Sequence, residues 1–148
     1  MMKQHLNIDG SEYVFKKYEK WPSFHDAEII SLNLDRAKSE GSYGPTVIVE
    51  IHCFQITNEV VNNHYKTVKH SIIKLCFYDV VEFELDHGFG QQNPLIGITI
   101  IDIRRDQLEN IHYKVSFDAH MNCDLRFKCS TIKVLSIEEG MPDGSVYA

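Results

Sequence analysis

The chain has 148 residues, which suits one domain, and we expect a single domain over 1–148 with its core in about 11–139. Hydrophobic residues make up 43% of the chain and charged residues 24%, which excludes a disordered segment and is typical of a globular protein. The formal net charge of −6 argues against a nucleic-acid binder, because phosphate binding requires a concentrated basic surface.

The first predicted element is a short helix over 11–18, with Ser11 as its N-cap. Pro22 follows this helix and ends it, because the residue before a proline is disfavoured in the helical conformation. Apolar residues recur at the three-to-four spacing of one helix face, and they are Val14, Phe15, Tyr18 and Trp21.

The remainder of the chain is predicted to form strands, because apolar and polar residues alternate along it. The apolar face of the first strand consists of Ile30, Leu32 and Leu34. A strand over 46–55 follows, and its inner positions are Val47, Val49, Ile51 and Cys53. Residues 57–66 are ambiguous, and we interpret them as a loop.

Two further strands are predicted at 69–78 and 80–86, and a glycine-containing loop at 87–94 follows them. Their inner positions are Ile73, Leu75 and Phe77, then Val81, Phe83 and Leu85. Residues 95–103 are almost wholly apolar, which predicts a central strand.

The last strands form a hairpin and a final single strand, with a tight turn at 120–122. Their inner positions are Ile111, Tyr113, Val115 and Phe117, then Cys123, Leu125, Phe127 and Cys129, and finally Ile132 and Val134. The whole pattern predicts a mainly β (α+β) fold. We expect an antiparallel sheet, a sandwich or a half-barrel of about seven to eight strands with one short N-terminal helix.

The four cysteines contain no CxxC pair, and three of them stand where the alternation requires an apolar residue. We therefore expect buried free thiols without a disulfide and with little reactivity at Cys53, Cys76, Cys123 and Cys129. Residues 1–5 lack an apolar signal core, and no stretch approaches the ~18 apolar residues of a membrane span. These features predict a cytoplasmic protein that does not bind membranes.

Known catalytic and cofactor-binding motifs are missing. The run Gly88-Phe89-Gly90 lacks the third glycine of a dinucleotide fingerprint, and the chain holds no GK[ST], HExxH or GxSxG motif. The eight histidines do not have the close spacing of a zinc motif. We therefore assign no catalytic, cofactor-binding or metal-ligating residue and expect no cofactor.

One short cluster has the residue types of a catalytic site. If a strand begins at Asp26, its carboxylate and that of Glu28 share one face with Ile30, about 7 Å apart, while His25 faces away. Two such carboxylates can act as acid and base or hold a metal. They can also tie down loop backbone or an arginine at the edge of the sheet, and we favour this structural or recognition role while the other stays open.

A second cluster lies at the final hairpin. A three-residue turn at 120–122 sets Asp118 opposite Asp124 and Lys114 opposite Lys128, which is unfavourable for like charges. Either the strand register slips by two residues, or the two aspartates bind a cation or a basic partner near the turn, where His120 lies.

Three segments carry a resemblance to a known family. The run over 21–29, Trp-Pro-Ser-Phe-His-Asp-Ala-Glu-Ile, looks like the signature of the immunity protein 50 family. The run over 89–96, Phe-Gly-Gln-Gln-Asn-Pro-Leu-Ile, is similar to the family's aromatic-Asn-x-Gln-Asn-x-Ile element, with Gly90 in place of the first Asn. The run over 127–129, Phe-Lys-Cys, resembles an aromatic-x-Cys element that precedes a strand.

The resemblance covers residues ~13–139 and implies a bacterial antitoxin that binds and silences a cognate toxin of a polymorphic toxin system. It implies no reaction and no cofactor, and the expected partner is that toxin rather than nucleic acid or membrane. Two alternatives stay open, a metal-binding protein or hydrolase that uses His25, Asp26 and Glu28, and an accessory domain without a toxin partner. The family-motif candidates for a structural or recognition role are Trp21, Phe24, His25, Asp26, Glu28, Gln92 and Asn93.

Overall fold

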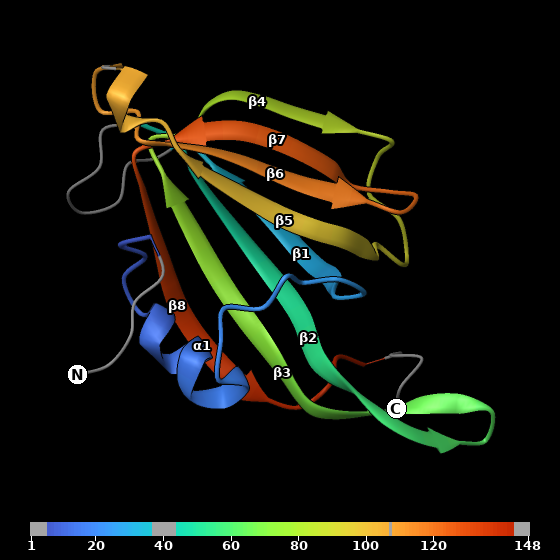
Figure 1. Ribbon diagram of the computed structural model, residues 1–148. Helices are drawn as coiled ribbons and strands as arrows, with labels where there is room; N and C mark the ends of the chain where they lie inside the picture. Colours follow the sequence, from blue (N-terminus) through green and yellow to red (C-terminus); the bar gives the residue numbers. More distant parts are fainter. Residues whose placement is uncertain (1–5, 37–43, 107, 144–148) are drawn as a thin grey trace.

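The structure is a computed structural model that describes residues 6–36, 44–106 and 108–143. It is mostly β, with one short helix and two antiparallel sheets of four strands each (Figure 1). The predicted mainly β fold is therefore confirmed. The elements are α1 (Ser11–Tyr18), β1 (Glu28–Asp35), β2 (Thr46–Val61), β3 (His64–Tyr78), β4 (Val81–Asp86), β5 (Leu95–Asp102), the 3-10 turn η1 (Arg104–Asp106), β6 (Tyr113–Ala119), β7 (Asp124–Cys129) and β8 (Thr131–Glu139).

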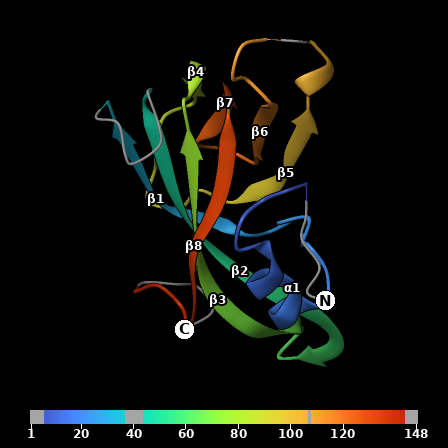
Figure 2. The same cartoon turned by 90° about the vertical axis from the view of Figure 1, so that its left-hand side faces the viewer.

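The two sheets pack face to face around one core (Figure 2). The first sheet has the strand order β1-β2-β3-β8, and the second has the order β4-β7-β6-β5. The ring of Phe77 in the first sheet meets the rings of Phe117 and Phe127 in the second edge-on, at centroid distances of 5.8 and 4.9 Å. Such edge-to-face contacts are a favoured aromatic geometry and add to the burial energy.

The helix α1 lies against the lower half of the first sheet in Figure 1, beyond the part that the second sheet covers. Val14 and Tyr18 face the core, and the Tyr18 hydroxyl donates to the carbonyl oxygen of Lys69 at 2.7 Å. Among the residues that the structure describes, no helix is long and apolar enough to cross a membrane.

The alternation predicted from the sequence identifies most of the core correctly. Nearly all the inner positions predicted for β2, β3, β6, β7 and β8 are buried. The residues confirmed in this way are Val47, Val49, Ile51, Cys53, Ile73, Leu75, Phe77, Tyr113, Val115, Phe117, Cys123, Leu125, Phe127, Cys129, Ile132 and Val134. Alternation therefore locates the inward face of a strand wherever its pleat is regular.

All four cysteines are free and buried, as the sequence indicates. Burial raises the pKa of the Cys53 and Cys123 thiols to about 11, and that of Cys129 to about 12. Because the thiolate is the reactive form, these thiols should react slowly at neutral pH.

The predicted N-cap is wrong by one residue. Gly10 caps α1 in a left-handed conformation with φ of 84°, and Ser11 is the first helical residue. The reason is the close approach to β8: Asp9 pairs in parallel with Lys133, and a Cβ on Gly10 would lie 2.7 Å from the Val134 carbonyl oxygen. Only glycine satisfies both the dihedral angle and the space at this position.

The inner face predicted for the first strand is confirmed at Leu32, which packs against the core, and is wrong at Ile30 and Leu34. The pairing of β1 with β2 shifts between Ile29 and Ser31, so that Ile29 and Leu32 face the buried residues of β2. Ile29 is 1% exposed, whereas Leu34 is 57% exposed. The bulge inserts one extra residue, so that Ile29 rather than Ile30 shares the inner face with Leu32, which the residue pattern alone does not reveal.

Residues 57–66, which we interpreted as a loop, form the ends of two strands and the tight turn between them. β2 and β3 continue past the sheet as a two-stranded ribbon over 55–68 that projects from the body of the protein (Figures 1 and 2), and we call this ribbon the arm. Its turn is made by Asn62 and Asn63, which have φ of 52° and 68°. Asparagine tolerates this left-handed conformation, so the two residues form a tight hairpin turn.

The apolar segment 95–103 forms an edge strand, not the predicted central one. Among the strands that the structure describes, β5 pairs only with β6, and Ile96 and Ile101 are each 49% exposed. An apolar run predicts a strand covered on both faces, but here only one face meets the core, through Ile98 and Ile100.

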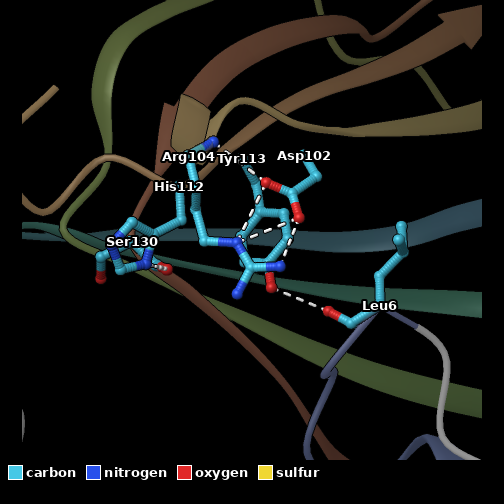
Figure 3. A network of polar contacts seen from close by, with 6 residues as sticks. All are labelled: Leu6, Asp102, Arg104, His112, Tyr113 and Ser130. Carbon is cyan, nitrogen blue, oxygen red and sulfur yellow. Dashed lines mark hydrogen bonds and ion pairs between the residues drawn. The ribbon is translucent and has the colours of Figure 1, made fainter. Parts of the chain in front are cut away.

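A polar network closes the end of the sandwich near η1 (Figure 3). Arg104 forms a two-pronged ion pair with Asp102, and this hydrogen bonding lowers the pKa of the Asp102 carboxyl to about 2. The Tyr113 hydroxyl donates to the Leu6 carbonyl oxygen at 2.8 Å and so ties the N-terminal segment to β6. The motif residues lie at the opposite end of the sandwich, where the β6–β7 turn and the start of β5 meet (Figure 1).

Candidate functional site

The motif segment 21–28 joins α1 to β1 and runs along the edge of β5. The Asp26 amide donates to the Leu95 carbonyl oxygen at 3.0 Å, and the Ile98 amide donates to the Ser23 carbonyl oxygen at 3.2 Å. An edge strand presents unpaired backbone groups, and this segment satisfies several of them on β5. The segment therefore connects the two sheets at one end of the sandwich.

Two aromatic residues anchor this junction. Phe24 is 2% exposed and belongs to the core. Trp21 meets Phe24 edge-to-face at a centroid distance of 5.6 Å, and it is partly buried against the core. Trp21 lines a surface hollow with Ile98 and Ile100 of the edge strand β5, which leaves it at the rim of the core.

Asn93 organises the loop between β4 and β5. Its side chain is buried, and its amide oxygen accepts from the Gly90 amide at 2.8 Å. Its amide nitrogen donates to the carbonyl oxygens of Gly90 and Ile29, at 2.9 and 3.3 Å. One side chain thus satisfies backbone groups of its own loop and of β1, as a buried polar group must. Its neighbour Gln92 is exposed, and the Gln92 carbonyl oxygen accepts from the side chain of Asn122.

Asp26 and Glu28 do not share a face, so the predicted pair of carboxylates is wrong. β1 begins only at Glu28, and Asp26 precedes it in a left-handed conformation with φ of 67°. A carboxylate oxygen of Glu28 accepts from the Asn93 amide at 3.2 Å. The strand geometry assumed from the sequence does not apply, and Glu28 instead ties down loop backbone, which was the other interpretation of this pair.

Asp26 instead lies between two histidines, one of them distant in sequence. Its carboxylate oxygens are 3.7 Å from His25 Nε2 and 3.9 Å from His120 Nε2. The three residues form the one group of possible metal ligands found among the described residues, with ligand atoms within 4.8 Å of one another. His25 was predicted to face away from Asp26, and the left-handed turn at Asp26 explains the difference.

His120 is the site residue that the sequence analysis did not assign. It lies in the β6–β7 turn, 94 positions after Asp26, and its amide donates to the Pro94 carbonyl oxygen at 3.0 Å. The available signal was its place in a short turn beside two aspartates. Nothing in the local pattern showed that this turn meets the motif segment.

The register of the final hairpin does not slip. Phe117 pairs with Leu125 and Lys114 pairs with Lys128, as a three-residue turn requires, so the slip by two residues is wrong. Neighbouring groups compensate the like charges. Lys128 forms an ion pair with Glu82 at 2.8 Å, Arg126 approaches Asp124 at 3.9 Å, and Asp118 accepts from the Ser116 hydroxyl at 2.9 Å.

These features define a class of protein: a small protein of two packed antiparallel sheets, in which a short motif segment holds the sheets together. The family model described as Immunity protein 50 matches residues 10–140, and the chain belongs to this family. Neither the curated proteins nor the solved structures gave a match.

Proposed function

We propose that this chain is an immunity protein that binds a cognate bacterial toxin of a polymorphic toxin system and neutralises it by stoichiometric protein–protein interaction, without a reaction of its own. The observation that carries this proposal is the match to the Immunity protein 50 family over 10–140. We place the protein in the cytoplasm, where it would protect the cell that makes the toxin.

The geometry of the motif segment supports binding over catalysis. The hydrolase alternative needed His25, Asp26 and Glu28 on one reacting surface. Glu28 accepts a hydrogen bond from the Asn93 amide and does not belong to the group of His25, Asp26 and His120, while Phe24 and Asn93 are buried in structural roles. Because these contacts account for most of the motif, the alternative of a metal-binding protein or hydrolase that uses His25, Asp26 and Glu28 together is not favoured.

The arm is the surface that we propose for contact with the toxin. Four large apolar side chains on the arm are 45–62% exposed, because a ribbon outside the sheets has no core to cover them. Exposed apolar clusters on a soluble protein mark sites of protein contact, and a protruding ribbon can enter a partner's groove or extend its sheet. These four residues are Ile56, Val60, Val61 and Tyr65.

A double substitution separates binding from catalysis. Asp26→Asn with Glu28→Gln keeps the shapes of both side chains and removes both charges, which would abolish acid–base chemistry. An immunity protein that acts by binding through the arm should still protect cells that express the toxin, with the same dependence on toxin dose. Loss of protection in a variant that remains folded, together with protection by substoichiometric amounts of the wild type, would support an enzyme instead.

A further inference from the structure

The cluster of His25, Asp26 and His120 has no part in the proposed contact with a toxin. We propose that these three residues bind one divalent first-row transition-metal ion, with Zn²⁺ as the fitting ion, at the end of the sandwich where the motif segment meets the β6–β7 turn. The proposal does not depend on the proposed function, since binding of the ion requires neither a toxin nor catalysis.

The distances suit a shared ion. Asp26 Oδ2 is 3.7 Å from His25 Nε2, and Asp26 Oδ1 is 3.9 Å from His120 Nε2. Ligands of a tetrahedral zinc ion bind at about 2.0–2.2 Å, so that neighbouring ligand atoms are roughly 3.3–3.6 Å apart. Small side-chain rotations therefore bring the three atoms to coordination distance.

Three successive carbonyl oxygens position the three ligand residues. The His120 amide donates to the Pro94 oxygen, the Asp26 amide donates to the Leu95 oxygen, and His25 Nδ1 lies 3.0 Å from the Ile96 oxygen, each at 3.0 Å. The two ligand segments are far apart in sequence, yet both are fixed to the same three residues at the start of β5. The fold thus places the ligands together without help from a metal.

The contact of His25 with Ile96 also determines the tautomer of the ring. A carbonyl oxygen only accepts, so Nδ1 carries a proton, and in the neutral ring Nε2 is then the nitrogen that holds the lone pair. Nε2 is the nitrogen that faces Asp26. Histidine ligands of metal sites typically donate their other nitrogen to a carbonyl or carboxylate in this way, which orients the ring and raises its basicity.

The ligand set selects the kind of ion. Two imidazoles and one carboxylate suit Zn²⁺, Ni²⁺ and Co²⁺, whereas Mg²⁺ and Ca²⁺ prefer oxygen ligands. The side chains of His25, Asp26 and His120 are 58%, 39% and 44% exposed, which leaves the ion an open path. Three protein ligands also leave a coordination position for water.

Calorimetric titration of the full, untagged, chelator-treated chain with Zn²⁺ tests the proposal. The wild type should bind one ion, and millimolar Mg²⁺ should not compete. His120→Ala should weaken binding by at least about tenfold, since loss even of an outer partner of a metal site weakens affinity 10–100-fold. His64→Ala is the matched control, because it removes an exposed histidine of the arm, outside the cluster, and should leave the affinity unchanged.

Asp26→Asn provides a second variant that keeps the fold. Asparagine tolerates the left-handed conformation of position 26, and this variant should lose zinc affinity while its unfolding midpoint without metal stays close to that of the wild type. The cluster is instead a set of simple surface ion pairs if the wild type does not bind Zn²⁺, or if His120→Ala and Asp26→Asn bind it as tightly as His64→Ala. Either result overturns the proposal, whatever the outcome of the toxin experiments.

Discussion

The buried side chain of Asn93 satisfies backbone groups of two separate segments. It satisfies the amide and carbonyl of Gly90 and the carbonyl of Ile29, and its own amide donates to Glu28. The motif position therefore has a structural role that is independent of any partner. The sequence indicated a loop at this place but not which of its side chains lies inside.

Substitution of Asn93 by Ala should destabilise the protein. The change removes the partner of the buried Ile29 carbonyl and of the half-buried backbone groups of Gly90, and each buried group left unsatisfied costs about 1–3 kcal/mol. Urea unfolding monitored by tryptophan fluorescence measures this loss. The control is Gln92→Ala, an exposed neighbour whose side-chain change should stay within about 0.5 kcal/mol. Equal midpoints for both variants would contradict the structural role of Asn93.

His52 is a buried titratable residue, and its burial predicts that the folded protein loses stability in acid. It is 1% exposed, and its Nε2 lies 2.9 Å from His70 Nδ1. Burial, and then the neighbouring His70, lower the pKa of His52 to about 4. The unfolded chain, with a histidine pKa of about 6.5, therefore binds a proton more readily than the folded protein between these two values.

The stability that His52 contributes should be complete above pH 6.5 and should be lost as the pH falls to about 4. The full loss is about 3 kcal/mol, since one pKa unit corresponds to about 1.4 kcal/mol. Urea midpoints measured across this range should fall steeply for the wild type and for His64→Gln, whose histidine is exposed. His52→Gln should flatten the profile, and a profile as steep as that of the wild type would exclude His52 as the cause.

Among the helices and strands, regular alternation predicts most of the core residues. It does not predict the segments where the backbone is irregular. The predicted inner faces of β2, β3 and β7 hold because their pleats are regular where they cross the core. The bulge in β1, the continuation of β2 and β3 into the arm and the edge position of β5 were missed. Each depends on which strand lies alongside, and a single strand's residue pattern does not contain that information.

Substitutions on the arm should weaken toxin binding without changing the stability of the protein. Val60 pairs with Tyr65 across the ribbon, so Val60→Lys with Tyr65→Glu replaces an exposed apolar pair by an opposite-charge pair. The unfolding free energy should change by less than about 1 kcal/mol, because both residues lie outside the core. Affinity for the toxin should fall at least about tenfold, since a contact hot spot contributes roughly 2 kcal/mol or more.

Leu34→Lys is the control for the arm variant. Leu34 is 57% exposed, close to the 61% of Val60, but it lies on β1. Surface plasmon resonance with the toxin domain should show wild-type affinity for this control. If the arm variant bound as tightly as the control, the toxin would contact another surface.

At the scale of the whole molecule, the candidate site arises from contacts between distant segments. The motif residues His25 and Asp26 were visible in the sequence, but their neighbour His120 was not, because the three meet only when the β6–β7 turn packs on the start of β5. The like charges of the final hairpin are explained at the same scale. Glu82 of β4 forms an ion pair with Lys128 of β7, which is possible because β4 and β7 are neighbours in the second sheet.

The proposed function requires that the protein protect the cell by occupying its toxin. The measurement titrates the purified protein against a fixed amount of the proposed cognate toxin, with toxin activity and light scattering as the two readouts. We predict a stable complex and a sharp end point, where activity vanishes at the same whole-number ratio that the complex shows. Complete inhibition far below that ratio, or inhibition without a complex, would contradict the account.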